Sequence, residues 1–178
     1  MINRLGLNLG VATCRYRIFD NIAASLTGVG IMVPLICLIA ALFFFRILGL
    51  EWHYFANWHM ALRAALGAVF LLTASAHWGK QRAEMVRMVP ESMGNAGRRV
   101  TATGFAEIAI AAGLQIPKIA PWVAGIGVVM LCCLFPANVK AAREHLTISH
   151  RPVMPAVPRL ILQIIFIAAL IGCVRPNR

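Results

Sequence analysis

Five long apolar segments divide this chain, and short polar or charged segments separate them. The first runs from Ile22 to Phe45 and contains no charged residue. The other four are Asn57–His77, Val100–Ile116, Ile119–Val139 and Arg159–Val174. About 20 helical residues, each adding about 1.5 Å, cross a hydrocarbon core of roughly 30 Å. The pattern therefore predicts five transmembrane helices.

The composition supports a membrane protein made only of helices. Hydrophobic residues make up 60% of the 178 positions, charged residues make up 13%, and the mean hydropathy is +0.77. Lipid offers no hydrogen bonds to an open strand, so helices are the expected spanning elements. We expect one helical bundle without a separate soluble domain, and the lipid bilayer as its first partner.

Basic residues predict the orientation of the bundle. Of the 17 Lys and Arg residues, twelve precede the first segment or lie in two of the four connections. These connections are the one between the second and third segments and the one between the fourth and fifth. Only Lys118, Arg175 and Arg178 fall on the opposite side. Because cytoplasmic loops carry the excess of Lys and Arg, the N-terminus is predicted inside and the C-terminus outside.

This organisation divides the chain into four parts. Residues 1–21 form a cytoplasmic tail, 22–50 an additional N-terminal helix, 57–174 a four-helix bundle, and 175–178 a short C-terminal tail. Residues 79–99 are expected to include a short helix in the inner headgroup layer. The third apolar segment is expected at the centre of the bundle, because small residues let neighbouring helices approach closely. Those small residues are Ala102, Ala106, Ala109 and Gly113.

Several kinds of site have no support in the sequence. The net charge of +11 comes from scattered loop residues, so nucleic-acid binding is not expected. The five cysteines form no C-x-x-C or Cys/His ligand spacing, which gives no reason to expect a metal site. No nucleophile–base pair or phosphate-binding glycine loop is visible. Stand-alone catalysis is therefore not expected.

Glu107 is the unusual residue of the apolar segments. A carboxylate at membrane depth costs a few kcal/mol, so it must face the bundle interior and find a partner or a proton. By helical spacing its face also carries Thr103, Gly104 and Ala111, which would allow a neighbouring helix to come close. An acid in this environment is a candidate for proton handling or ligand contact.

Three other polar residues, His77, Asn138 and Gln163, are expected near the same inner depth as Glu107. Together the four form a candidate cofactor-binding layer contributed by four helices. The alternative is that the three act as hydrogen-bonding links between helices or as anchors at the interface. Arg63 is a candidate ion-pair partner of Glu107; alternatively its side chain extends to the outer surface.

Several short segments, taken together, resemble the DoxX-like family of small bacterial membrane proteins. They are Ala74–Trp78, Met85–Pro90, Thr103–Glu107, Phe135–Val139 and Pro158–Gln163, within residues 60–174. The resemblance implies a four-helix bundle in the bacterial cytoplasmic membrane, to which the first apolar segment is an addition. The family pattern has Gly three residues before His and Phe after it, where this chain has Ala74 and Trp78.

The resemblance implies an accessory or membrane-anchoring component of a redox system, with quinone as a candidate cofactor and a membrane or peripheral redox protein as a candidate partner. The cysteine motifs of some redox relatives are missing here. Two alternatives stay open: a non-catalytic scaffold or assembly factor for another membrane protein, and a small transporter that couples to protons through Glu107.

Overall fold

The structure is a computed structural model that describes residues 33–144, 147–148, 151–152 and 156–174. The chain divides into two units, residues 1–33 and 34–178, and Val33 is the only described residue of the first. The expected tails at 1–21 and 175–178 lie outside the described residues, as do positions 22–32 of the first apolar segment.

The described residues form helices, apart from one short pair of strands, which confirms the all-helical expectation. Five of the helices are long: α2 (Val33–Leu48), α4 (Trp58–Ala76), α6 (Ala96–Gly113), α7 (Ala120–Arg143) and α8 (Ala156–Gly172). Three are short: α3 (His53–Ala56), α5 (Arg82–Met88) and the 3₁₀ turn η1 (Glu91–Met93). The strands β1 (Thr147–Ile148) and β2 (Arg151–Pro152) pair antiparallel, Thr147 with Pro152 and Ile148 with Arg151.

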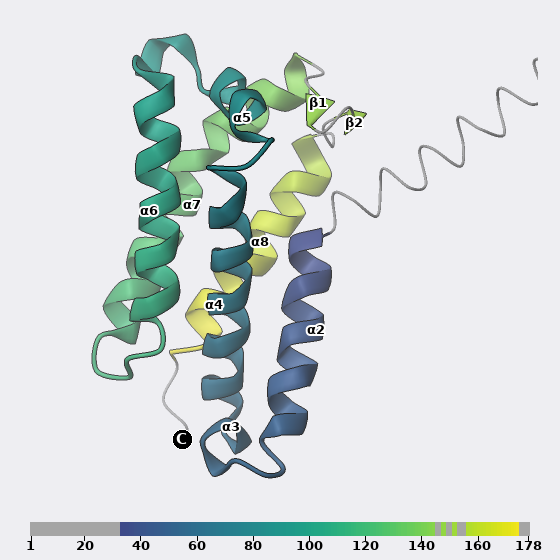
Figure 1. Cartoon of the computed structure of the whole chain (residues 1–178), viewed down its shortest axis with the longest axis vertical. Helices are drawn as coiled ribbons and strands as arrows, with labels where there is room; N and C mark the ends of the chain where they lie inside the picture. The colour runs from purple at the N-terminus through teal and green to yellow at the C-terminus, as the bar shows by residue number, and fades with distance from the viewer. Residues whose placement is uncertain (1–32, 145–146, 149–150, 153–155, 175–178) are drawn as a thin grey trace, which may run out of the picture. The chain divides into compact units, whose positions relative to one another are not determined.

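The long helices alternate in direction along the chain (Figure 1). The end of α4, the start of α6 and the end of α7 lie at the end of the bundle that also carries α5 and the strands. We call this the α5 end, and the opposite end, where α3 and the α6–α7 connection lie, the α3 end. The helices α6 and α7 form an antiparallel hairpin, as expected from the sequence, but the connection between them is the six residues 114–119 rather than a tight turn at Pro117–Lys118. The helix α5 also matches the short helix expected within 79–99.

The core lies around α4 rather than α6. In α4 a continuous stretch from Ala61 to Phe70 is buried except for Ala64 and Ala68, and Leu66 and Ala65 are completely buried. The described part of α2 joins this core through Leu38. The expectation that the third apolar segment is the centre of the bundle is wrong, because α4 has neighbours on several sides whereas α6 leaves one face open.

The small residues of α6 explain this error. Of the four, Ala102 and Ala109 are exposed, Ala106 is half-buried and Gly113 is buried, where a Cβ would lie 2.8 Å from Val123 Cγ2 of α7. The buried face of α6 also includes Gly104, Glu107 and Ile110. The small-residue spacing therefore indicated a close approach correctly at Gly113 but not along the whole helix, because spacing alone does not say which small residues a neighbouring helix covers.

Two described helices, α4 and α7, are long enough and apolar enough to cross a membrane. The helices α2 and α8 are apolar but shorter, about 24 to 26 Å at 1.5 Å per residue. The 18 residues of α6 include three charges, Arg98, Arg99 and Glu107. The described helices therefore do not support the expected count of five membrane spans by length and composition.

Candidate functional site

The candidate site lies where the end of α4 meets the middle of α6. Asn57 caps the start of α4, where its side-chain oxygen accepts a hydrogen bond of 2.9 Å from the His59 N–H. His77 caps the end of α4, and its N–H donates to the Ala74 carbonyl at 3.0 Å. His77 is 3% exposed and Glu107 of α6 is 6% exposed. Two ionisable side chains are therefore buried in the contact between these helices.

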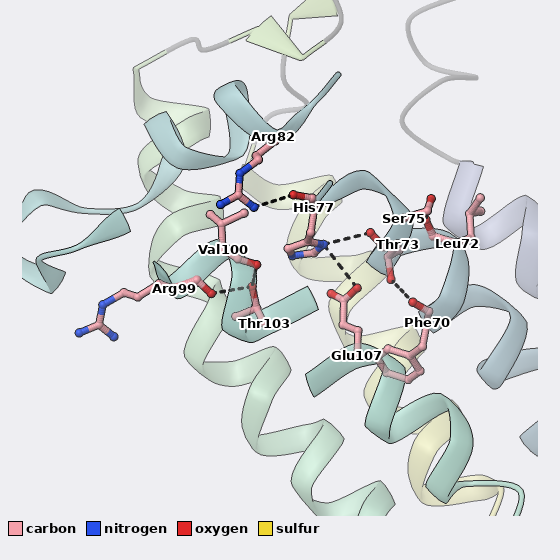
Figure 2. A network of polar contacts seen from close by, with 10 residues as sticks. All are labelled: Phe70, Leu72, Thr73, Ser75, His77, Arg82, Arg99, Val100, Thr103 and Glu107. Atoms are coloured by element: carbon pink, nitrogen blue, oxygen red, sulfur yellow. Dashed lines mark hydrogen bonds and ion pairs between the residues drawn. The ribbon is translucent and has the colours of Figure 1, made fainter. Parts of the chain in front are cut away.

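The two side chains point toward one another (Figure 2). His77 Nδ1 lies 3.8 Å from Glu107 Oε2, within ion-pair distance but too far for a good hydrogen bond. The same Nδ1 lies 3.1 Å from the Thr73 carbonyl oxygen. A carbonyl oxygen can only accept, so Nδ1 carries the hydrogen in this contact. In the neutral ring, Nε2 is then left as an acceptor.

Gly104 makes the close approach of the two helices possible. A Cβ at this position would lie 2.9 Å from His77 Cβ and 2.7 Å from Trp78 Cη2, both closer than real side chains allow. Gly104 is one turn before Glu107, on the same buried face of α6. The absence of a side chain at Gly104 thus leaves the space that the His77 and Trp78 side chains occupy beside Glu107. This agrees with the expectation that the Gly104 face admits a neighbour.

Glu107 is incompletely satisfied by the protein. Its Oε2 atom is buried and has no hydrogen-bond partner. Buried polar atoms usually have a partner, and an exception requires an explanation such as a bound ligand, a water or a proton. Together the pair offers one carboxyl group and one imidazole that can exchange a proton or hydrogen-bond a polar ligand.

Arg82 lies at the α5 end of the site and links its two helices. Its guanidinium donates to the His77 carbonyl at 2.9 Å, to Thr101 Oγ1 at 2.8 Å and to the Gly97 carbonyl at 3.2 Å. One side chain therefore links the end of α4 to the first turns of α6. Figure 2 shows the hydrogen bond from Arg82 to the backbone that carries His77. Sequence reasoning missed this role, because nothing separates Arg82 from the other basic residues of that connection.

The expected ion pair between Arg63 and Glu107 does not form between these two described residues. Arg63 Nε donates to the Cys173 carbonyl at 3.0 Å, and Arg63 Nη1 contacts Met60 Sδ at 3.7 Å. Arg63 precedes His77 by 14 residues, which is about 21 Å along α4. The Arg63 guanidinium is therefore too far from Glu107 to pair with it, and it donates instead to a backbone carbonyl at the end of α8. The alternative of extension to the surface is also wrong, since Arg63 is only 8% exposed.

Asn138 and Gln163 lie in a second polar contact, between α7 and α8. Asn138 Oδ1 accepts from Arg159 Nη1 at 2.7 Å, and Gln163 Nε2 donates to the Leu131 carbonyl at 3.0 Å. No hydrogen bond or ion pair joins these described residues to His77 or Glu107. The structure thus brings together two members of the predicted layer, not four. The sequence predicted a similar depth for the four, but depth does not determine which helices are neighbours.

Gln115 is another polar residue that the sequence analysis did not single out. Its Nε2 atom donates to the Arg63 carbonyl at 3.1 Å and to the Ala111 carbonyl at 3.0 Å, and lies over Gly67. This contact fixes the α3 end of the α4–α6 pair, as Arg82 fixes the α5 end. Among the described residues, no group of three His, Cys, Asp or Glu side chains could hold a metal ion.

Residues 66–172 match a family described as a domain of unknown function (DUF8561). The chain belongs to this family. The match covers more than half of the chain and includes His77, Glu107, Asn138 and Gln163, but neither Arg63 nor α2. No curated protein and no solved structure matches the chain.

Proposed function

We propose that this protein is an integral membrane helical bundle, in which α2, α4, α6, α7 and α8 all lie within the bilayer. The supporting observation is the apolar surface of the long helices. Only 11% of the most apolar stretch of α7 is buried, and Ile126 and Val129 are 60% and 62% exposed. On α2, Phe43 is 66% exposed. Soluble monomers rarely expose apolar patches beyond a few hundred Å². Lipid would cover these faces.

The ends of the bundle favour the orientation proposed from the loops. Trp52, Tyr54 and Trp58 are exposed at the α3 end, and Trp78 is exposed at the α5 end. Aromatic rings of this kind anchor helices at both membrane interfaces. Basic side chains concentrate at the α5 end, which we therefore assign to the cytoplasmic side.

We propose further that the His77–Glu107 pair is the working part of the molecule, a polar site that hydrogen-bonds a quinone headgroup. The observation that carries this proposal is the buried Glu107 Oε2 atom without a hydrogen-bond partner, beside the His77 imidazole and the Thr73 side chain. A quinone carbonyl requires hydrogen-bond donors, which a protonated carboxyl or imidazole supplies, while exposed helix faces suit its apolar tail.

In this proposal the protein is an accessory or anchoring component of a redox system in a bacterial cytoplasmic membrane. Its support is the resemblance of five short segments to the DoxX-like family, three of which contain His77, Glu107 and Gln163. The protein would hold the quinone for a membrane or peripheral redox partner and would not catalyse a reaction alone.

The test is to purify the full chain in mild detergent and measure quinone in the extracted lipids per mole of protein. The wild type should retain about one quinone per chain. Glu107→Leu removes the carboxyl and supplies no other hydrogen-bond donor, whereas a Gln amide would still donate. The lost hydrogen bond is worth about 1.5 kcal/mol or more, so retention should fall about tenfold. Glu144→Leu is the matched control, because Glu144 is exposed at the end of α7. Absence of quinone from the wild type, or equal retention in both variants, would reject the proposal.

The scaffold alternative is favoured by one specific observation, the open face of α6. Ala102, Ala109 and Ala112 are exposed there, and small residues allow a helix of another protein to pack closely. Ala109→Phe would obstruct this face without touching Glu107. If the protein is a scaffold, Ala109→Phe should abolish capture of a stoichiometric membrane partner, while Glu107→Gln should preserve it. A wild-type protein that remains a monomer would rule this alternative out.

A further inference from the structure

A second polar region of the molecule lies at the α5 end, away from the contact between His77 and Glu107. A cavity of about 460 Å³ opens between α5, η1, the start of α6 and the end of α7. Its lining includes two basic side chains, Arg87 and Lys140, and one acidic side chain, Glu91. Val86, Val89 and Pro90 form an apolar part of the wall.

The two cations have free hydrogen-bonding capacity. Lys140 Nζ donates to the Val89 carbonyl at 3.1 Å, which fixes the ammonium at the cavity and uses one of its three hydrogens. Arg87 is exposed in the last turn of α5. Asn95, the residue before α6, makes no side-chain cap, so the first N–H groups of that helix add positive potential to the same lining.

The surroundings of the cavity are also basic. Among the described side chains at the α5 end, eight are Lys or Arg and three are Glu. The basic residues are Lys80, Arg82, Arg87, Arg98, Arg99, Lys140, Arg143 and Arg159, and the acidic residues are Glu84, Glu91 and Glu144. An anion is therefore attracted to this end, and the cavity offers it two cations beside an apolar wall.

We propose that this cavity binds the headgroup phosphate of an anionic phospholipid. Arg87 and Lys140 contact the phosphate, and Val86, Val89 and Pro90 contact the glycerol and the first methylene groups. The mixed wall favours a lipid over a soluble anion, which has no apolar part to bury. The inference rests on the proposed membrane location of the bundle, but not on the role of His77 and Glu107.

The experiment measures lipid binding to the purified full chain by native mass spectrometry. Phosphatidylglycerol and phosphatidylcholine with identical acyl chains are titrated at physiological salt. The wild type should bind one phosphatidylglycerol at least tenfold more tightly than phosphatidylcholine. One basic residue near an anionic lipid contributes about a fivefold change in affinity, so Arg87→Gln should weaken binding about fivefold and Arg87→Gln/Lys140→Gln about thirtyfold.

Matched variants serve as controls for the lipid-binding measurement. Arg98→Gln/Arg143→Gln removes the same charge from exposed positions outside the lining, and because these residues act only at longer range, the loss of affinity should be much smaller than in Arg87→Gln/Lys140→Gln. Lys140→Arg should also bind normally, because it keeps the charge, and Arg87→Gln should not disturb the fold, because the Arg87 side chain is exposed. Equal losses in both double variants, no preference for phosphatidylglycerol, or equally tight binding of inorganic phosphate would overturn the proposal. Glu107→Gln should bind phosphatidylglycerol like the wild type, so failure of the quinone proposal is distinguishable from failure of this one.

Discussion

Replacing Gly104 by Ala tests the closest contact of the candidate site. The added Cβ would lie 2.7 Å from Trp78 Cη2, 2.9 Å from His77 Cβ and 3.0 Å from His77 Cγ. The Trp78 ring lies at the surface, 44% exposed, and can rotate away. His77 Cβ is attached to the backbone, so it moves only if the end of α4 moves away from α6.

The magnitude follows from two opposing effects. Overpacking a tight contact costs about 1 to 3 kcal/mol. Replacing a helical glycine by alanine returns about 0.5 to 1 kcal/mol of backbone entropy. Gly104→Ala should therefore lower the free energy of unfolding by about 1 to 2 kcal/mol. Gly125 of α7 is the matched control, because a Cβ there has no atom within 4 Å. Gly125→Ala should raise the free energy of unfolding by up to about 1 kcal/mol.

The assay is reversible unfolding of the full chain in mixed detergent micelles, followed by helical circular dichroism. The two alanine variants should differ by about 1 to 3 kcal/mol, with Gly104→Ala the less stable. If Gly104→Ala is as stable as Gly125→Ala, then α4 and α6 are not in the close contact described, and the geometry of the His77–Glu107 pair loses its basis.

Two further predictions use the same unfolding assay. Arg82→Gln loses the charged hydrogen bonds that link α4 to α6 and should lower the free energy of unfolding by about 2 to 3 kcal/mol. The exposed Arg87→Gln should lower it by less than about 0.5 kcal/mol. Equal effects of the two substitutions would mean that Arg82 is not a structural link. Glu107→Gln should change the free energy of unfolding by less than about 1 kcal/mol, because Oε2 has no hydrogen-bond partner to lose, whereas Leu66→Ala in the core should cost about 2 to 5. A loss of several kcal/mol in Glu107→Gln would show that the carboxyl is a structural link and not a site left open.

The sequence allowed the helices and the unusual acid to be predicted, because both depend on local patterns. The second apolar segment, Asn57–His77, differs from α4 by one residue at each end. Glu107 was singled out because a carboxyl in an apolar helix is costly, and Gly104 on its face correctly indicated close approach by another helix. These inferences require only the helical period and the energetic cost of burying a charge.

What the sequence left undetermined depends on which helices are neighbours. His77, Asn138 and Gln163 have similar expected depths, yet only His77 is on the helix that packs against Glu107. Arg63 was assigned a partner by its charge, whereas its actual acceptor is the Cys173 carbonyl. Every residue has a backbone carbonyl that can accept a hydrogen bond, so the sequence does not indicate which carbonyl a given side chain will bind. For the same reason the three hydrogen bonds of Arg82 could not be predicted.

Trp78 lies beside the proposed ligand site formed by His77 and Glu107, so its fluorescence permits a direct measurement of ligand binding there. Its ring centroid lies 6.2 Å from that of His77, while the other three tryptophans are exposed toward the α3 end. A variant with Trp52, Trp58 and Trp122 changed to Phe leaves Trp78 as the only tryptophan, and a short-chain quinone is titrated into it in micelles. We expect saturable quenching with an affinity that is about tenfold weaker in Glu107→Leu and unchanged in Glu144→Leu. Quenching that never saturates, or that has the same affinity in Glu107→Leu, would show that His77 and Glu107 do not bind the quinone.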